Sequence, residues 1–374
     1  MTDRPWMIYG ANGYTGELAA REAVARGLRP VLAGRNARAV AELALELGLD
    51  SRAFALDDPA AAAHGVAGMA AVLHCAGPFV RTSRPMVDAC LAAGAHYLDI
   101  TGEIAVFTAI LSPASGRGEA ARAAGVALLP GVGFDVVPSD CLAARLAAAL
   151  PGATELDLAF ANDGGPMETR MSRGTLKTMI ESLPAAGAVR RDGRIVPVPL
   201  AYDARVIDFG GRLGERWAMT IPWGDVATAY YSTGIPNIRV YTGTPPAAIR
   251  RARRLSPLLP LAGWAPVKRF LARRVDRGEP GPSAAVRATA RVHLWGEVRN
   301  VASGAGAAVA ATLETPEGYA FTAVSSVECA RRAAAGLVPP GAWTPSRAFG
   351  ADYVTTLPGV VAGPLVATPG KSRK

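Results

Sequence analysis

Short apolar runs alternate with amphipathic stretches along the first third of the chain. The runs predict buried strands at 6–9, 30–34, 52–56, 71–75, 96–100 and 126–129. Between several of them, apolar residues recur at helical spacing, which predicts helices at 17–26, 38–47, 85–93 and 116–124. Strands that alternate with helices through short loops form a parallel sheet covered by helices. Residues 1–137 are therefore predicted to form an α/β domain with a doubly wound, Rossmann-type sheet.

From about residue 151 the pattern changes to longer, partly alternating runs with few helices between them. Such runs predict half-buried strands at 156–160, 286–292, 307–313 and 318–327. Residues 138–340 are therefore predicted to form a second, α+β domain with a largely antiparallel mixed sheet, which we assign to substrate binding and dimerisation. The tail 363–374 carries proline, glycine and lysine and is predicted to be disordered.

A glycine-rich turn joins the first predicted strand to the first predicted helix. Within it, Gly10 permits a tight turn, Gly13 lets the backbone approach a pyrophosphate, and Gly16 lets the helix pack closely on the strand. The N–H groups at the start of the helix are then available to phosphate oxygens. This loop predicts a dinucleotide site that includes Gly10, Asn12, Gly13, Tyr14, Thr15 and Gly16.

The second predicted strand ends at Gly34 and is followed by Arg35 rather than by an acidic residue. An aspartate or glutamate at this place binds the ribose 2′-hydroxyl of NAD, whereas an arginine suits the 2′-phosphate of NADP. Gly34 and Arg35 therefore predict NADP(H) as the cofactor, although an arginine can also stack on adenine.

Residues at the carboxyl ends of the other predicted strands lie on the rim where such a sheet binds ligands. Asp57 follows the third strand, and Cys75 ends the fourth. After Cys75, Gly77 would let a nicotinamide ribose approach the backbone, while Pro78 and Phe79 would wall one face of the nicotinamide ring. The predicted cofactor site therefore also includes Asp57, Cys75, Ala76, Gly77, Pro78 and Phe79.

Three titratable residues, Tyr97, Asp99 and Glu103, lie in and just after the fifth predicted strand. A nicotinamide-dependent reductase needs a proton donor beside the hydride path, so we name these three as candidate catalytic residues. The alternative is structural, because Asp99 or Glu103 also suits the cap of the following helix. Asp135, after the sixth strand, is a candidate for substrate binding with the same ambiguity.

Two places in the second domain are candidates for substrate binding. Arg173 and Thr175 lie in a sequence typical of a helix N-terminus, which can hold an anionic group; a plain cap with an exposed arginine is the equally favoured alternative. Trp223 lies in an otherwise apolar stretch and is predicted to belong to a pocket wall or to the core.

The net charge of +9 is concentrated in one segment. Residues 250–277 contain nine basic residues and Asp276 alone as an acid, so nucleic-acid binding by the whole protein is not expected. Leucine, tryptophan and phenylalanine are interleaved with these arginines. The segment Arg250–Arg277 is therefore predicted to lie on an anionic membrane or to dock an acidic carrier domain, and a solvated lid over the substrate pocket is the alternative.

Length and composition favour a soluble enzyme of two domains. The 374 residues suffice for two cores, and the chain has no run of the roughly 18–20 apolar residues that cross a bilayer. The first strand begins too early for a signal peptide, so we expect a cytoplasmic protein, peripheral at the inner face of the membrane if the basic segment binds there. The 4 cysteines and 4 histidines show no disulfide or metal-site spacing, and no metal is predicted.

Several stretches in combination resemble the saccharopine dehydrogenase-like oxidoreductases, in particular the trans-acting enoyl reductase branch. They are Tyr9–Gly16, Leu32–Arg35, Cys75–Phe79, Tyr97–Glu103, Pro130–Asp140, Ser172–Thr175, Ile221–Asp225, Ser232–Pro236 and Thr344–Gly350. The resemblance implies an NADP-binding Rossmann domain, a second domain on a mixed sheet, and a C-terminal segment, about 341–362, that returns to the first domain. It also implies a lipid-like substrate.

Together these observations predict an NADPH-dependent oxidoreductase that reduces a C=C or C=N bond of a lipophilic or carrier-bound substrate. A short-chain dehydrogenase would also suit the glycine loop, but it needs a Tyr-x-x-x-Lys pair, and none of the lysines of this chain has a tyrosine at that spacing. A non-catalytic NADP-binding sensor or regulatory protein stays as the alternative, because no single residue is unambiguously the catalytic acid.

Overall fold

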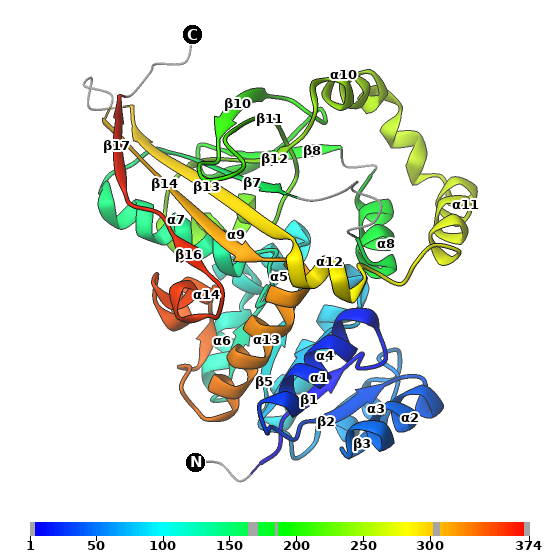
Figure 1. Cartoon of the computed structure of the whole chain (residues 1–374). Helices are drawn as coiled ribbons and strands as arrows, with labels where there is room; N and C mark the ends of the chain where they lie inside the picture. Colours follow the sequence, from blue (N-terminus) through cyan, green and yellow to red (C-terminus); the bar gives the residue numbers. More distant parts are fainter. Residues whose placement is uncertain (1–3, 164–170, 184–185, 302–306, 370–374) are drawn as a thin grey trace. The chain divides into compact units, whose positions relative to one another are not determined.

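The computed structural model describes residues 4–163, 171–183, 186–301 and 307–369. The chain divides into two compact units. One consists of Met1–Val137 with Tyr319–Phe349, and the other of Pro138–Gly318 with Gly350–Lys374. Each unit is built around its own sheet, which positions the candidate residues of that unit (Figure 1).

The sheet of the first unit is parallel throughout and has the order β15-β6-β5-β4-β1-β2-β3. Its strands are β1 (Met7–Tyr9), β2 (Val31–Gly34), β3 (Ser51–Ala53), β4 (Ala71–His74), β5 (His96–Asp99), β6 (Ala127–Leu129) and β15 (Gly341–Ala342). The order of strands reverses between β1 and β4, and such a switch point is where doubly wound sheets bind ligands at the strands' carboxyl ends. The predicted Rossmann-type sheet is confirmed.

The helices of the first unit begin and end where local chemistry favours it. They are α1 (Tyr14–Ala25), α2 (Ala37–Leu47), α3 (Pro59–Val66), α4 (Phe79–Ala93), α5 (Ile104–Leu111), α6 (Arg117–Ala123), α13 (Gly318–Ala334), α14 (Pro345–Phe349) and the 3₁₀ turn η1 (Pro113–Ser115). The Asn36 side chain accepts the Ala39 N–H at the start of α2, which then ends at Gly48 in a left-handed conformation. Strands β1, β2, β4, β5 and β6 are almost fully buried and form the core, whereas the edge strand β3 is largely exposed.

The sheet of the second unit is mixed and has the order β10-β11-β12-β7-β13-β14-β16. The strands of this unit are β7 (Glu155–Asn162), β8 (Gly187–Arg191), β9 (Arg194–Val198), β10 (Ala204–Asp208), β11 (Glu215–Thr220), β12 (Asn237–Gly243), β13 (Arg291–Asn300), β14 (Ala307–Pro316), β16 (Val361–Ala362) and β17 (Val366–Pro369). Among the described strands, β12 pairs with β7 in parallel and the other pairings are antiparallel. This confirms the predicted, largely antiparallel sheet.

Two helices of the second unit, α7 and α9, pack on one face of this sheet. The helices here are α7 (Val137–Ala149), α8 (Arg173–Ser182), α9 (Asp225–Thr233), α10 (Pro246–Leu255), α11 (Ala265–Asp276), α12 (Ala284–Thr289) and the 3₁₀ segments η4 (Ser256–Gly263) and η5 (Tyr353–Thr356). A Cβ atom at Gly296 would lie 2.6 Å from Leu146 Cδ1, so this glycine lets α7 approach β13 closely. Ser139 Oγ donates to Asp225 Oδ2 at 2.9 Å and links α7 to α9.

Two segments predicted as strands contain helices instead. Residues 284–289 form α12, because the Ser283 side chain caps the Val286 N–H, and the strand begins only at Arg291. Residues 318–334 form α13, a helix with buried residues all around its axis, among them Phe321, Ser325 and Val327. A helix buried on all sides has no polar stripe, so its short alternating pattern resembles that of a strand.

The C-terminal part of the chain also differs in detail from the prediction. Strand β15 pairs with β6 of the first unit, whereas residues from Gly350 onward are grouped with the second unit, and α13 with the first. Residues 366–369 form β17, which pairs with β14 (Figure 1), where the sequence predicted disorder. The pairing satisfies backbone groups along β14, which composition alone does not reveal. Residues 370–374 lie outside the described part of the chain.

Candidate functional site

Gly10 and Gly16 are required by the geometry of the loop itself. Gly10 has a φ of +82°, and its N–H donates to Ala33 O at 2.7 Å, which ties the loop to β2. A Cβ atom at Gly10 would lie 2.9 Å from Ala76 N, and one at Gly16 would lie 2.2 Å from Gly10 O. A side chain at Gly16 would therefore collide with the backbone of the loop, and one at Gly10 with the backbone at the end of β4.

Gly13 is different, because a side chain there would require only a small shift of the backbone. It has a φ of −86°, and a Cβ atom there would lie 3.2 Å from its nearest neighbour, Gly10 O. Gly13 is also the N-cap of α1, which has no side-chain cap hydrogen bond. An uncapped helix N-terminus presents N–H groups and the positive end of the helix dipole to an anion. This end of α1, which includes Tyr14 and Thr15, is suited to a pyrophosphate.

The end of β2 lies beside this loop. A Cβ atom at Gly34 would lie 3.2 Å from Asn12 Oδ1, so the Asn12 side chain lies over Gly34. Arg35 follows as an exposed residue, and Asp57 is exposed after β3. Burial raises the pKa of Tyr9 to about 12, with smaller opposing effects of the Arg35 and Asp57 charges, which places both near the carboxyl end of β1.

The segment after β4 has one exposed side and one buried side. Gly77 is exposed, Pro78 is half-buried, and the peptide bond between them is cis. Phe79 is only 7% exposed and packs edge-on against His74, so its ring belongs to the core and not to an exposed wall.

Two half-buried side chains, Thr82 and Cys75, lie around this segment. Thr82 Oγ1 donates to Ala76 O at 2.7 Å and fixes the orientation of that carbonyl group. Burial raises the pKa of the half-exposed Cys75 thiol to about 12, which keeps the thiol neutral.

Tyr97 and Asp99 form a buried pair under the rim. Both are 0% exposed, and the Tyr97 hydroxyl donates to Asp99 Oδ2 at 2.6 Å. Asp99 Oδ1 accepts the N–H groups of Thr101 at 3.0 Å and of Gly131 at 2.8 Å. Burial raises the pKa of Asp99 to about 6, against the opposite effect of these hydrogen bonds. The pair joins the loop after β5 to the loop after β6.

Glu103 also makes backbone contacts. Its carboxylate accepts the N–H of Phe79 at 2.8 Å and of Val80 at 2.7 Å, and its own N–H donates to Thr101 Oγ1 at 3.0 Å. It therefore caps α4, the helix that follows the Gly77–Pro78 segment, rather than the helix after Glu103. Thr101 is not among the residues predicted from the sequence; its place midway between Asp99 and Glu103 in Asp-x-Thr-x-Glu was the available signal.

Asp135 lies against the same loop. Its carboxyl oxygen Oδ2 is so close to Gly102 that a Cβ atom there would lie 2.8 Å away. The residue is half-buried, and desolvation raises the pKa of its carboxyl to about 7. A carboxylic acid that titrates near neutrality at the rim of such a sheet is suited to donate or accept a proton.

The candidate residues of the second unit lie at two places. Arg173 starts α8, and its guanidinium donates to Gly278 O from Nε at 2.9 Å; Ser172 Oγ accepts the Thr175 N–H at 3.2 Å as the cap of the helix. These contacts are those of an ordinary capped helix start. Trp223 is half-buried and packs against Phe160, with the ring centroids 4.8 Å apart. The tryptophan thus belongs to an aromatic pair, and its partner Phe160 is not among the residues predicted from the sequence.

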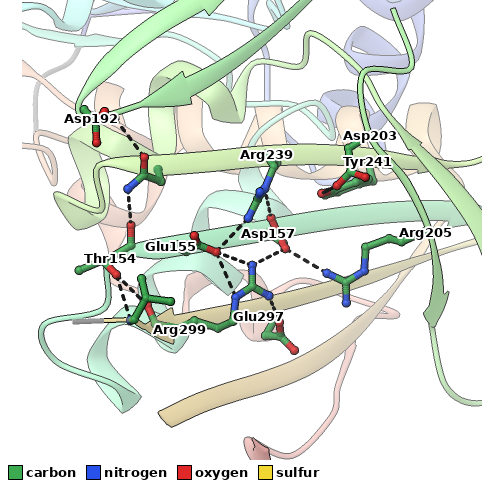
Figure 2. Close-up of polar contacts among 12 residues, drawn as sticks. Thr154, Glu155, Asp157, Asp192, Asp203, Arg205, Arg239, Tyr241, Glu297 and Arg299 are labelled. Atoms are coloured by element: carbon green, nitrogen blue, oxygen red, sulfur yellow. Dashed lines mark hydrogen bonds and ion pairs between the residues drawn. The ribbon is translucent and has the colours of Figure 1, made fainter. Parts of the chain in front are cut away.

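A charged cluster occupies the sheet face of the second unit opposite α7 (Figure 2). Asp157, 0% exposed, accepts Arg239 Nε at 2.8 Å, Arg205 Nη1 at 3.0 Å and Arg299 Nη2 at 2.7 Å. Glu155 and Glu297 complete the ion pairs of Arg239 and Arg299. Three arginines are thus balanced by three carboxylates. Burial lowers the pKa of Arg299, but Asp157 and Glu155 outweigh this and raise it, so the cluster is an internally neutral structural element.

The described residues contain no group of three or more histidines, cysteines or acids arranged to hold a metal ion. Among the described helices, none has the length and apolar character needed to span a membrane.

Comparison with known proteins identifies the first unit. Residues 6–128 match the family model of the saccharopine dehydrogenase NADP-binding domain. The match covers β1 to β6, the glycine loop, Arg35 and the Asp99–Glu103 segment. The predicted NADP-binding domain and the predicted resemblance are confirmed.

The curated relatives include mycobacterial trans-acting enoyl reductases. A Mycobacterium tuberculosis protein provisionally given that name is 32% identical over 193 residues, which cover 48% of this chain and 44% of that protein. The trans-acting enoyl reductase of Mycobacterium leprae is 31% identical over 141 residues, which cover 36% and 33%. The matched part of the chain thus spans less than half the length of these relatives.

Among solved structures, the apo form of the L-Glu-forming saccharopine dehydrogenase of Saccharomyces cerevisiae has the same fold. It aligns with a TM-score of 0.62 over 98% of this chain and 100% of its own, at 11% identity. The likeness concerns the fold alone and confirms the predicted α/β class.

Proposed function

From a chain whose residues 6–128 form an NADP-binding domain of the saccharopine dehydrogenase type, we propose that this protein is an NADPH-dependent reductase. Its substrate is lipophilic or carrier-bound, and the bond reduced is a C=C bond. The names of the relatives, trans-acting enoyl reductases, favour this bond over C=N and favour a substrate presented by another protein.

The observation that carries the proposal is the uncapped N-terminus of α1 beside an exposed arginine. Gly13 leaves the start of α1 without a side-chain cap and without a Cβ atom, which is the space a pyrophosphate needs. Arg35, exposed at the end of β2, supports binding of the 2′-phosphate. These residues suit NADP(H), with Thr15 beside the pyrophosphate and with Asn12 and Gly34 completing the adenosine side.

NADPH supplies the hydride, and the chain must supply the proton that completes the reduction. We assign the proton to the Asp135 carboxyl, because its pKa of about 7 keeps a large share protonated at neutral pH. The exposed Gly77 and the half-buried Pro78 would border the nicotinamide end of the site.

Tyr97, Asp99 and Glu103 position this region rather than contact the substrate. Asp99 holds the backbone at Thr101 and Gly131, and Glu103 holds the backbone at Phe79, immediately after Pro78. Each carboxylate oxygen of Asp99 and Glu103 accepts at least one hydrogen bond from the protein, so a supporting role agrees with their contacts.

In the second unit, Trp223 with Phe160 supports binding of a lipophilic substrate chain, since an aromatic pair offers apolar area that is only half-buried. Arg173 and Thr175 would hold an anionic group of the carrier-bound substrate beside α8. The second unit would also carry the contacts of a homodimer, which light scattering at two protein concentrations tests.

Turnover distinguishes the reductase from a sensor. NADPH oxidation is followed by its near-ultraviolet absorbance on adding a long-chain enoyl thioester, free or on a carrier protein, or a cyclic imine. We expect oxidation with the enoyl substrates and none in the Gly13→Val variant. If NADPH binds but neither class of substrate is reduced, the protein is an NADP-binding sensor or regulatory protein. NADPH oxidation with the imine alone would show that the bond reduced is C=N and not C=C.

A further inference from the structure

A row of apolar side chains lies on one side of the 3₁₀ segment η4 in the second unit. Leu255, Leu258, Leu261 and Trp264 follow one another at intervals of three residues, which is the number of residues in one turn of a 3₁₀ helix. They are 43%, 55%, 66% and 69% exposed, respectively. We call these four residues the apolar ridge; it faces solvent along the whole of η4.

The opposite side of the same segment is attached to its own unit. Ile249 is buried, Arg253 Nε donates to Ala201 O at 3.0 Å, and Ser256 Oγ accepts the Leu200 N–H at 2.9 Å. On α11, Lys268 Nζ lies 2.8 Å from Glu181 Oε2, which joins α11 to α8 (Figure 1). The exposure of the ridge is therefore not that of a loose segment, because contacts on the other side hold α10, η4 and α11 in place.

Arginines flank the ridge at both of its ends. Arg250, Arg251 and Arg254 lie on α10, and Arg269, Arg273, Arg274 and Arg277 lie on or just after α11. All seven are exposed, and no described carboxylate lies within ion-pair distance of them. Phe270, 65% exposed, adds an apolar side chain among the arginines of α11. Positive charge therefore surrounds a row of apolar side chains whose exposure to water is unfavourable.

We propose that the apolar ridge and its flanking arginines dock on the surface of an anionic lipid bilayer. The ridge would enter the region between headgroups and acyl chains, with Trp264 at the depth that tryptophan prefers, while the guanidinium groups contact lipid phosphates. The docking goes beyond the reductase function and does not depend on it.

The shape of the surface favours a bilayer over an acidic carrier protein. Four side chains that project in a row form a raised edge, and a fluid bilayer accommodates such an edge by displacing lipids. A folded acidic protein would need a complementary apolar groove. A lid over a substrate would instead need the apolar side turned away from solvent, whereas here the polar contacts lie on the anchored side and the apolar residues on the open side.

The test uses the full chain and vesicles sedimented with bound protein. Vesicles consist of phosphatidylcholine alone or of a two-to-one mixture with phosphatidylglycerol. We expect binding to the mixed vesicles at low salt, weakening as salt rises, and little binding to neutral vesicles. Replacing Arg250, Arg251 and Arg254 with Gln should lower the partition coefficient about 100-fold.

Matched variants separate this surface from general charge and apolarity. Replacing Arg38, Arg84 and Arg216 with Gln removes the same charge from exposed positions outside the segment and should change binding less than about threefold. Leu258→Ser with Leu261→Ser should lower binding at least about tenfold, whereas Leu45→Ser on α2, 85% exposed in the native chain, should not. The tryptophan emission should shift to shorter wavelength on binding, and Trp264→Phe should remove most of that shift while binding persists.

Several outcomes would overturn the proposal. These are no binding to anionic vesicles, equal loss in the matched controls, binding to an acidic carrier protein only, or self-association of the chain that the ridge substitutions abolish. NADPH affinity is measured for each variant and should not change, so a failure of vesicle binding is distinguishable from a failure of the reductase proposal.

Discussion

Gly16 and Gly13 of the loop lack a side chain for different physical reasons. Gly16 has no room for a side chain because Gly10 O would lie 2.2 Å from its Cβ atom, so the fold of the loop depends on it. Gly13 has an ordinary φ of −86°, and its nearest neighbour, Gly10 O, would lie 3.2 Å from a Cβ atom. A side chain there needs a backbone shift of only a few tenths of an ångström, whereas the bound pyrophosphate leaves it no room. Substitutions at the two positions should therefore have different effects.

Gly13→Val should abolish NADPH binding and lower the melting temperature of the unliganded protein only slightly. Gly16→Val should lower the melting temperature by several degrees, because a shift of the loop backbone by a clash of this kind costs on the order of 1–3 kcal/mol. Thermal unfolding with and without NADPH measures both effects. Normal NADPH binding by Gly13→Val would show that the glycine loop is a surface turn and not part of the cofactor site.

The protonation state of Asp135 should make the activity of the enzyme depend on pH. If its carboxyl donates the proton, turnover should fall as pH rises through about 7, where the acid form is lost. Asp135→Asn should lower kcat about 10²- to 10⁴-fold and remove this limb of the profile. A variant that kept both the rate and the limb would exclude Asp135 as the donor.

The same residue should make the stability of the folded state depend on pH. The pKa of Asp135 rises from 3.8 to about 7 on folding, so between these values the folded state binds more protons than the unfolded state. Stability therefore falls as pH rises from about 4 to 7. Asp135→Asn should weaken this decline, which urea unfolding at pH 5 and pH 8 measures; Asp99, with a folded pKa of about 6, contributes a decline of the same sign that the variant retains. A steeper decline in Asp135→Asn than in the native chain would contradict the raised pKa.

Part of the candidate site could be predicted from sequence, and the physical reasons differ by residue. The glycine loop is predictable because its geometry depends on contiguous residues. The function of Glu103 is not, because its partners are the N–H groups of Phe79 and Val80, more than twenty positions earlier in the chain. The titratable group of Glu103 and its suitability as a helix cap are predictable from the sequence, but the fold determines which helix it caps.

At the scale of elements, the charged cluster on β7, β10, β12 and β13 is the feature whose loss should cost most. Asp157→Ala leaves Arg205, Arg239 and Arg299 without a buried partner, and breaking a buried ion pair from one side costs about 3–5 kcal/mol. Glu42→Ala, which removes the exposed partner of Arg38 on α2, should cost at most about 1 kcal/mol. Urea unfolding measures the difference, and a cost for Asp157→Ala as small as that for Glu42→Ala would show that water screens the cluster.

Sequence patterns predicted the elements of the first unit better than those of the second. Strands β1, β2 and β4 are short, buried and bounded by glycine, proline or helices, so an apolar run identifies them. Helix α13 was taken for a strand because nearly every turn of it is buried, and α12 because its Ser283 cap is a local signal outweighed by the alternation that follows. The charged cluster was missed because alternate residues of β7 face opposite sides of the sheet, and its partners come from three other strands.

At the scale of the whole molecule, two properties are assigned to different units. Cofactor binding belongs to the first unit, whose family match ends at residue 128. The excess positive charge belongs to the second, where residues 250–277 carry it. Hydrogen exchange in the presence of NADPH should therefore protect the amides of 10–17 and 75–80 and leave α10 and α11 unchanged; protection confined to α10 and α11 would contradict this assignment.

The most direct test of the account is the affinity of the chain for NADPH relative to NADH, measured by fluorescence titration with the wild type and Arg35→Asp. We predict that the wild type binds NADPH at least about tenfold more tightly than NADH, since a guanidinium–phosphate contact contributes about 1.5–3 kcal/mol. Arg35→Asp should weaken NADPH binding by more than about tenfold and narrow the preference for NADPH over NADH. Equal affinities in the wild type, or a preference unchanged by the substitution, would contradict the assignment of Arg35 and of NADP(H) to this site.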